Sequence, residues 1–433
     1  MNNFYSDFPI TNQKQWLEKV EKDLKGKTIE DTLHHFHPIE EIDYQSYGLH
    51  SDEQKHSSAP GQPPYLRGGK STDNDWINNV VVPVDTPKKM NQFALNQLMN
   101  GATGLTLDLT TFDKEESNQL IHEIGFAHIV VTFIYASKEQ FEWLQALADK
   151  DELHGTAFCS KKEQYGQIKG LRNQIVAGID VQYAGGNIKQ EIAYALHQGH
   201  QLLYKVMNKN EMTIDEAASQ IKFKMGIGSS YFFEISKFRV LRSLWYTIVQ
   251  SYQPKASCSS IAYIEAETGF INKSLKDPHT NLLRQTTEAL SAVLGGVDEL
   301  TIRPYDAWSN QPEQSKTQRL GLNIALLLKE ESYMDKVIDP VGGSYCIEKI
   351  TQTIKLEAWE LFQELEGKGS DFLQTEVKKT AAKRVESIKN NNTTLIGVNN
   401  YFNDKPSSKS WKINHQTPFG KPLVLEQKCT IKA

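Results

Sequence analysis

The sequence predicts an α/β protein: a (β/α)8 barrel of the TIM type with an N-terminal helical arm and a C-terminal helical extension. Short β-branched runs alternate with stretches of helical period, which indicates βαβ units and a parallel sheet. The 433 residues suffice for one barrel of about 250 residues and two flanking segments. No GxGxxG fingerprint follows a strand, which favours a barrel over an open doubly wound sheet. That open sheet stays the alternative, because six of the eight strands can be recognised.

The arm contains one clear amphipathic helix. Trp16, Val20 and Leu24 recur every four residues, Asn12 is the expected N-cap, and Gly26 ends the pattern. The expected segments are a docking arm with linker (1–60), the barrel (61–345), and the C-terminal helical extension with its tail (346–433).

The barrel elements are expected in alternating order. Strands are expected within 79–85, 104–110, 127–133, 173–181, 261–264 and 300–303. Helices are expected at 87–99, 114–124, 138–148, 186–206, 229–252, 278–294 and 313–328, followed by a long helical stretch at 347–388.

Composition excludes several classes of protein. Hydrophobic residues make up 39% and charged residues 23%, a globular balance. The net charge of −5 without a basic block argues against a nucleic-acid surface. No apolar run is long enough for a membrane span, and the N-terminus has no secretory signal. The four cysteines form no CxxC pair, which predicts reduced thiols, a cytoplasmic location and no cysteine zinc site.

Two groups of histidines are weak candidates for metal ligands. His34, His35 and His37 fall on what looks like a half-exposed strand, and His197 and His200 share one helix face. Neither group has a carboxylate at a ligand spacing such as HExxH. We therefore expect polar surfaces and no metal.

Asp180 is the best catalytic candidate that the pattern alone provides. It is expected at the end of a buried strand, and catalytic groups of barrels gather at the carboxyl ends of strands. The more ordinary interpretation is an acid that caps the following loop and helix. The glycine pair Gly342-Gly343 lacks the Lys-Ser/Thr of a P-loop, so a tight turn is the simpler explanation.

Several segments together resemble the barrel of the methylmalonyl-CoA mutase family. The more specific ones are TGFINKSLKDPHTNLLRQTTEALSAVLGGVDEL from Thr268 and DPVGGSY from Asp339, with KMGIGSSYFFEISKFRVLRSLW from Lys224. YLRGG from Tyr65, VQYAGGNIKQEIAYAL from Val181 and LIGVNNYF from Leu395 match in the same order, so the resemblance covers about residues 60–402. The N-terminal arm is similar to the subunit-docking arm of that family.

The resemblance implies a barrel threaded by its acyl-CoA substrate and followed by a cobalamin-binding domain with a DxHxxG histidine. Here the run from Asp277 has Leu282 in place of the glycine, and only about 30 residues follow Tyr401. We therefore expect this chain to lack the cobalamin-binding domain and the partner to bind adenosylcobalamin. The residues that could be vestiges of a cobalamin-facing surface are Gly185, Gly186, Gly342 and Gly343.

The positions that match the family's active site have changed. Its Tyr-His pair falls on Ile179 and Asp180, and a carboxylate cannot donate the hydrogen bond of an imidazole. Its glutamine before Asp-Pro falls on Lys276, an arginine that faces CoA is lost around Asn79, and the Arg-Asn-Thr-Tyr segment has no counterpart. The resemblance leaves Tyr65, Arg67 and Asn79 as vestiges of substrate binding, and no catalytic residue is expected.

These departures imply the non-catalytic small subunit of a heterodimeric, adenosylcobalamin-dependent mutase that interconverts methylmalonyl-CoA and succinyl-CoA in propionate metabolism. The large catalytic subunit would be its partner and would hold the acyl-CoA. One alternative is the catalytic barrel of a split acyl-CoA mutase that uses a separately encoded cobalamin domain, with Asp180 and Lys276 as altered specificity residues. A binding or scaffold role is a third possibility.

Overall fold

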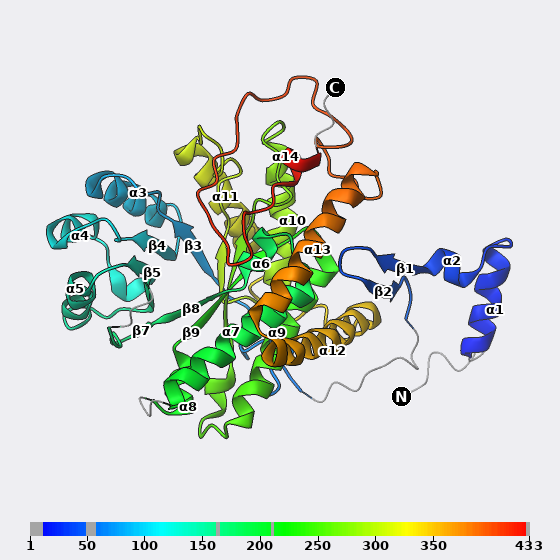
Figure 1. Ribbon diagram of the computed structural model, residues 1–433, viewed down its shortest axis with the longest axis horizontal. Helices are drawn as coiled ribbons and strands as arrows, with labels where there is room; N and C mark the ends of the chain where they lie inside the picture. The colour runs from blue at the N-terminus through cyan, green and yellow to red at the C-terminus, as the bar shows by residue number, and fades with distance from the viewer. Residues whose placement is uncertain (1–11, 49–57, 162–164, 209–211, 430–433) are drawn as a thin grey trace, which may run out of the picture.

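The computed structural model describes residues 12–48, 58–161, 165–208 and 212–429, and it confirms the predicted barrel (Figure 1). Nine strand segments pair in the order β7-β6-β5-β4-β3-β11-β10-β9-β8, and every pair is parallel. The two ends of this order, β7 (Leu171–Arg172) and β8 (Gln174–Ala177), are separated only by Asn173. They act as one strand that pairs with β6 on one side and β9 on the other. The sheet therefore closes into an eight-stranded ring.

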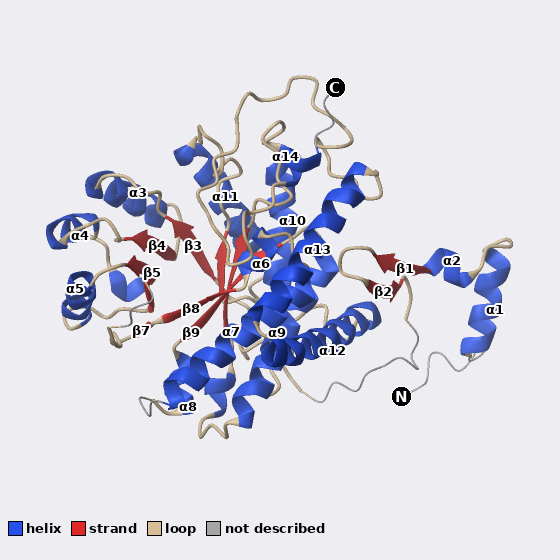
Figure 2. Cartoon of the chain, in the orientation of Figure 1, coloured by secondary structure: helices blue, strands red, loops and turns tan. Residues whose placement is uncertain are grey.

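The remaining elements surround this ring, with strands at the centre and helices outside (Figure 2). The other barrel strands are β3 (Ile77–Val81), β4 (Gly104–Asp108), β5 (Val130–Tyr135), β6 (Gly155–Cys159), β9 (Ile221–Ile227), β10 (Tyr263–Thr268) and β11 (Glu299–Thr301). The helices that follow strands are α3 (Pro87–Met99), α4 (Lys114–Leu120), α5 (Lys138–Ala148), α7 (Ile188–Asn208), α9 (Tyr231–Ser251), α10 (Thr280–Leu294) and α11 (Gln314–Leu326). Short helices are α6 (Ile179–Tyr183), α8 (Ile214–Ser219), η2 (Phe126–His128), η3 (Ser257–Ser260), and the π-helical turn η4 (Leu327–Glu331).

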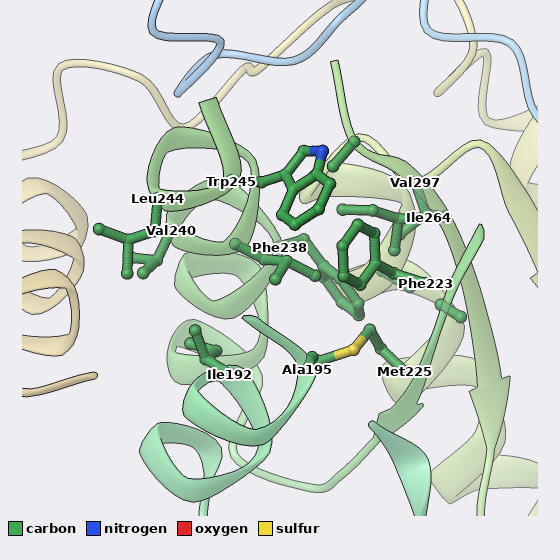
Figure 3. Packing of buried hydrophobic residues seen from close by; sticks show 14 of the residues in the cluster. Ile192, Ala195, Phe223, Met225, Phe238, Val240, Leu244, Trp245, Ile264 and Val297 are labelled. Atoms are coloured by element: carbon green, nitrogen blue, oxygen red, sulfur yellow. The ribbon is translucent and has the colours of Figure 1, made fainter. Parts of the chain in front are cut away.

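The main hydrophobic core lies between the strands and the outer helices (Figure 3). Phe223 and Met225 of β9 belong to it, and the ring of Phe223 meets Trp245 of α9 edge-on with centroids 4.9 Å apart. Successive side chains of a strand point to opposite faces. The alternate residues of the same strand, Lys222 and Lys224, therefore point into the barrel, and this alternation determines what the interior contains.

Several expected boundaries were wrong. The strand expected at 173–181 ends at Ala177, because the chain turns into α6 there. β6, β7 and β9 were not predicted; β9 reads IKFKMGI, and its alternating lysines mimic a solvated segment. The single stretch expected at 347–388 is two helices, α12 (Tyr345–Lys368) and α13 (Ser370–Lys389), separated by Gly369 at φ +79°.

The N-terminal arm extends away from the barrel, at the right of Figure 1. Its helix α1 (Gln13–Asp23) begins at the predicted N-cap Asn12, whose side chain accepts from the backbone N–H of Gln15. Helix α2 (Ile29–Leu33) and the antiparallel hairpin β1 (His34–His37)–β2 (Ile42–Gln45) follow. None of the helices in the described part of the chain has the length and apolar character that a bilayer-spanning segment needs.

The hairpin turn fixes the arm to the barrel. Glu40, 2% exposed, accepts a 2.9 Å hydrogen bond from the backbone N–H of Ile188 at the start of α7. A carboxylate is favourable there because the first N–H groups of a helix lack intrahelical partners. Arg384 of α13 lies 3.7 Å from the same carboxylate, and the Asn187 amide donates to the carbonyl of Ile39 at 3.2 Å.

A buried charge cluster lies beneath this contact. The Lys237 ammonium is 3.1 Å from Glu191 Oε2 and 2.5 Å from Glu234 Oε2, and all three side chains are buried. Burial raises the pKa of Glu234 to about 7, against the opposing attraction of Lys237. Burial raises the pKa of Glu191 as well.

We predict a pH dependence of stability from Glu234. Its folded-state pKa lies above the ordinary value of 4.5, so its stabilising contribution is complete below that value and is lost as the pH rises through about 7. The free energy of unfolding should fall over this window by up to about 3 kcal/mol relative to the Glu234→Gln variant. Urea denaturation of both proteins between pH 4.5 and 8 measures the difference. Parallel pH profiles would contradict the prediction.

Candidate functional site

The barrel interior is crossed by the side chain of Lys222. Its ammonium lies 2.8 Å from Glu265 Oε2 on β10 and 2.9 Å from Glu299 Oε2 on β11. It also donates a 2.8 Å hydrogen bond to Thr132 Oγ1 on β5. Strands β9 and β5 are not neighbours in the sheet, so this bond spans the interior. Lys222 and both glutamates are at most 1% exposed.

A second layer lies one residue pair further along the strands. The Lys224 ammonium is 2.6 Å from Glu267 Oε2 and 3.4 Å from Glu265 Oε1. Thr301 Oγ1 donates to Glu265 Oε1 at 2.9 Å, and the Asn79 amide donates to Thr301 Oγ1 at 2.8 Å. The strands β3, β9, β10 and β11 are thus linked through their inward-facing side chains.

The ion pairs keep Glu265 and Lys222 charged. Burial alone would raise the pKa of Glu265, but Lys222 and Lys224 outweigh it and lower the pKa to about 2. Burial would likewise lower the pKa of Lys222, but Glu265 and Glu299 raise it. Buried charges without partners are costly, so an extended ligand could pass along this axis only by breaking pairs that are difficult to replace.

Comparison with known proteins identifies the family. A family model described as methylmalonyl-CoA mutase matches residues 156–418. The methylmalonyl-CoA mutase small subunit of Porphyromonas gingivalis is 31% identical over 452 residues, which cover 92% of this chain and 71% of that protein. The chain belongs to the methylmalonyl-CoA mutase family.

More distant mutases match over most of this chain. The methylmalonyl-CoA mutase of Cereibacter sphaeroides is 25% identical over 89% of this chain and 64% of its own length. The mitochondrial enzyme of Bos taurus is 26% identical over 91% and 61%. The chain thus spans about two thirds of these relatives. A dihydropteroate synthase structure from Xanthomonas albilineans aligns with a TM-score of 0.33 at 12% identity over 59% of this chain and 94% of its own, which supports no inference.

The structure corrects the expected setting of Asp180. This residue lies on α6, three residues after the end of β8, and its Oδ1 pairs with His415 Nε2 at 2.7 Å. Ile179, its neighbour at the position of the mutase tyrosine, is buried in an apolar cluster with Tyr183 and Phe270. Both residues lie at the carboxyl end of the barrel, where they are engaged in contacts within the chain.

Lys276 lies in the loop after β10, at the same end of the barrel. Its backbone N–H donates to Glu426 Oε1 at 3.1 Å, and its carbonyl accepts from the N–H of Ser407 at 2.8 Å. The structure thus brings Asp180 and Lys276 to one end of the barrel, where each is bonded to the same C-terminal segment.

Tyr65 and Arg67 lie at the opposite end. The Tyr65 hydroxyl donates to the carbonyl of Ser257 at 3.1 Å, and Arg67 Nε lies 2.9 Å from Asp339 Oδ2. Asn79, the third expected vestige of substrate binding, is inside the barrel in the layer of Lys224. Tyr65, Arg67 and Asn79, which were expected to be vestiges of substrate binding, thus form hydrogen bonds within the chain that stabilise the fold.

The four glycines expected at a cobalamin-facing surface do not share one. Gly342 and Gly343 belong to the turn of Asp339 at the amino-terminal end, and Gly343 N–H donates to Glu348. Gly185 and Gly186 follow α6 at the carboxyl end, where their carbonyls accept from Arg384. A Cβ on Gly185 would lie 2.7 Å from Ala381 and from Leu423. Gly185 is thus packed against α13 and the C-terminal segment.

The histidines pair with other groups. His34 contacts Gln45, His35 contacts Ser46, and His37 contacts Ser230. His197 and His200 both face Glu366 of α12, with Nδ1 to oxygen distances of 2.5 and 3.0 Å. Within the described ranges no three His, Cys, Asp or Glu side chains are arranged to hold a metal ion, and the four cysteines are free thiols.

The interior ion pairs were not predicted from the sequence. The signal was present as alternating charges in IKFKMGI and YIEAET, where lysines and glutamates recur at every second residue. In a strand of a closed barrel that period places them all on the inner face.

We predict that Lys222→Met destabilises the protein by about 3–5 kcal/mol, because Glu265 and Glu299 lose their buried partner. The matched control is Lys19→Met, which removes an exposed i,i+4 pair with Asp23 and should cost under about 1 kcal/mol. Denaturant unfolding near pH 7 measures both. Equal effects of the two substitutions would show that the interior pairs do not matter.

Proposed function

We propose that this chain is a non-catalytic small subunit of an adenosylcobalamin-dependent methylmalonyl-CoA mutase. In this proposal a large catalytic subunit binds the cofactor and the acyl-CoA and interconverts methylmalonyl-CoA and succinyl-CoA. The single observation that carries it is the bridge from Lys222 of β9 to Thr132 of β5 across the barrel interior. A substrate that threads the barrel needs that space.

The energetics of the interior support the proposal. To admit a pantetheine-like chain, the barrel would have to separate Lys222 and Lys224 from their carboxylates. Breaking one buried pair costs about 3–5 kcal/mol, which ordinary ligand contacts would have to offset. The same argument weighs against the split-mutase alternative, because a separate cobalamin domain would not open the interior.

The residues at the barrel mouth support it independently. Asp180 accepts a hydrogen bond from His415 and has no proton to donate to a thioester carbonyl when ionised. The side chains of Ile179 and Asp180 are therefore used for contacts within the chain. The free thiols fit a reducing cytoplasm as the location of the complex.

The arm is the proposed contact with the large subunit. Trp16, Leu17, Val20 and Leu24 line one side of α1 and are only half-buried, and none of the eleven α1 residues, all of them described, is buried. Isolated helices of this length are marginal in water. Trp16 packs against Tyr47 of the same arm, with ring centroids 5.1 Å apart, and the stripe stays partly exposed. A partly exposed apolar stripe on a projecting helix is suited to docking on another subunit.

Co-expression with the large subunit of a methylmalonyl-CoA mutase tests the proposal. We expect a stoichiometric complex that is active with adenosylcobalamin, while this chain alone is inactive. Failure to associate would refute the subunit role. Turnover by this chain with only an isolated cobalamin-binding domain added would establish the split-mutase alternative instead.

We predict that Trp16→Ala combined with Val20→Ser weakens this complex at least about tenfold, since both side chains belong to the apolar stripe of α1. Monomer stability should change by less than about 1 kcal/mol because neither residue is buried. Lys14→Ala with Glu21→Ala, on exposed positions of the same helix, is the control. Affinity and unfolding are measured for each pair. Unchanged affinity of the Trp16/Val20 variant would place the interface elsewhere.

A further inference from the structure

The C-terminal segment crosses the mouth of the barrel. We call residues 404–429, which include helix α14 (Leu425–Cys429), the strap; it is the red segment of Figure 1. Catalysis in barrels of this type takes place at the carboxyl ends of the strands. The strap lies over the loops that follow three of those strands, β8, β10 and β11.

Backbone hydrogen bonds fix the strap at each of these loops. Its amides donate to carbonyls of the barrel loops at 2.7–2.8 Å; the pairs are Ser407 to Lys276, Lys412 to Trp308, and Leu423 to Tyr183. The contacts span the segment from near its beginning to the residues just before α14. The strap is thus held at several points along its length.

Buried polar anchors add to this attachment. The Lys409 ammonium lies 2.6 Å from Asp306 Oδ2, and Asp306 is fully buried. Glu426, 4% exposed, accepts from Trp411 Nε1 at 2.6 Å and from Ser274 Oγ at 2.5 Å. A carboxylate satisfied in this way is costly to expose or to leave unpaired.

Beneath the strap lies an apolar cluster that the strap completes. The barrel contributes Ile179, Tyr183, Phe270 and Trp308, and the strap contributes Trp411, Ile413 and Val424. The Tyr183 hydroxyl also donates to Glu267 Oε1 at 3.2 Å, so this cluster sits directly on the interior ion pairs. The cluster thus joins the strap to the charged interior of the barrel.

We propose that the strap occupies, within the same chain, the surface on which a cobalamin-bearing domain would have to dock to reach the barrel mouth. The cofactor of such a domain must approach the carboxyl ends of the strands, and here Trp411, Ile413 and Val424 of the strap cover that approach. The barrel mouth therefore does not accept a cobalamin domain. This inference deepens the proposed function and rests on it only for the identity of the excluded domain.

Hydrogen exchange of the intact chain tests the strap directly. The amides of Lys412 and Leu423 should exchange far more slowly than exposed loop amides, because both donate to carbonyls of the barrel loops beside the packed cluster. Exchange of these amides within seconds would overturn the proposal. Trp411→Ala with Lys409→Ala should speed exchange in 407–423 at least about tenfold without affecting β9, whereas the exposed control Lys405→Ala should leave both unchanged. Equal exchange in the two variants would overturn the anchoring role of these side chains.

Binding provides the second measurement. The probe is an isolated cobalamin-binding domain of a methylmalonyl-CoA mutase loaded with adenosylcobalamin. We expect no binding by the intact chain, and binding at micromolar concentration would refute the inference. Association with a large subunit is measured separately, so failure of the strap and failure of the subunit role can be told apart.

Discussion

The fold depends on the placement of two lysines inside a closed barrel. An ammonium taken out of water is tolerated only where carboxylates surround it, and Lys222 has Glu265 and Glu299 within 3 Å. These partners come from two further strands, and Thr132 comes from the far side of the ring. The interior pairs therefore set the relative positions of strands that share no backbone hydrogen bonds. They also fill the axis.

The ion pairs along the barrel axis are accompanied by a change in the contacts of residues at positions that resemble a substrate site. Arg67 is bound by Asp339, Asn79 by the interior hydroxyls, and Asp180 by His415. The residues at positions that resemble a substrate site thus make hydrogen bonds and ion pairs within the chain that stabilise the fold. In the proposed function, recognition of the partner takes place outside the barrel, at the apolar stripe of α1. In the proposed subunit role, the barrel serves as a scaffold for assembly.

Much of the fold could be predicted from the sequence because its signals are local. The period of Trp16, Val20 and Leu24 and the cap at Asn12 specify α1, and buried β-branched runs mark strands such as β4 and β5. β9 was missed because its period-2 lysines look solvated until the ring closes around them. The contacts of the candidate site residues were harder to predict from the sequence than the strands. The contacts of Asp180 with His415 and of Lys276 with Glu426 join residues more than 100 positions apart, and no local pattern encodes them.

Calorimetric titration of the isolated chain with methylmalonyl-CoA, with the large subunit titrated in parallel, shows most directly whether the barrel is closed to substrate. The filled interior predicts no saturable heat from this chain up to about 1 mM ligand, equivalent to less than about 4 kcal/mol of binding free energy. The large subunit should bind methylmalonyl-CoA with saturable heat. A one-to-one complex of this chain with methylmalonyl-CoA at a Kd of about 1 μM would show that the interior opens for the substrate. The ion pairs of Lys222 and Lys224 would then not be the barrier to binding that is proposed above.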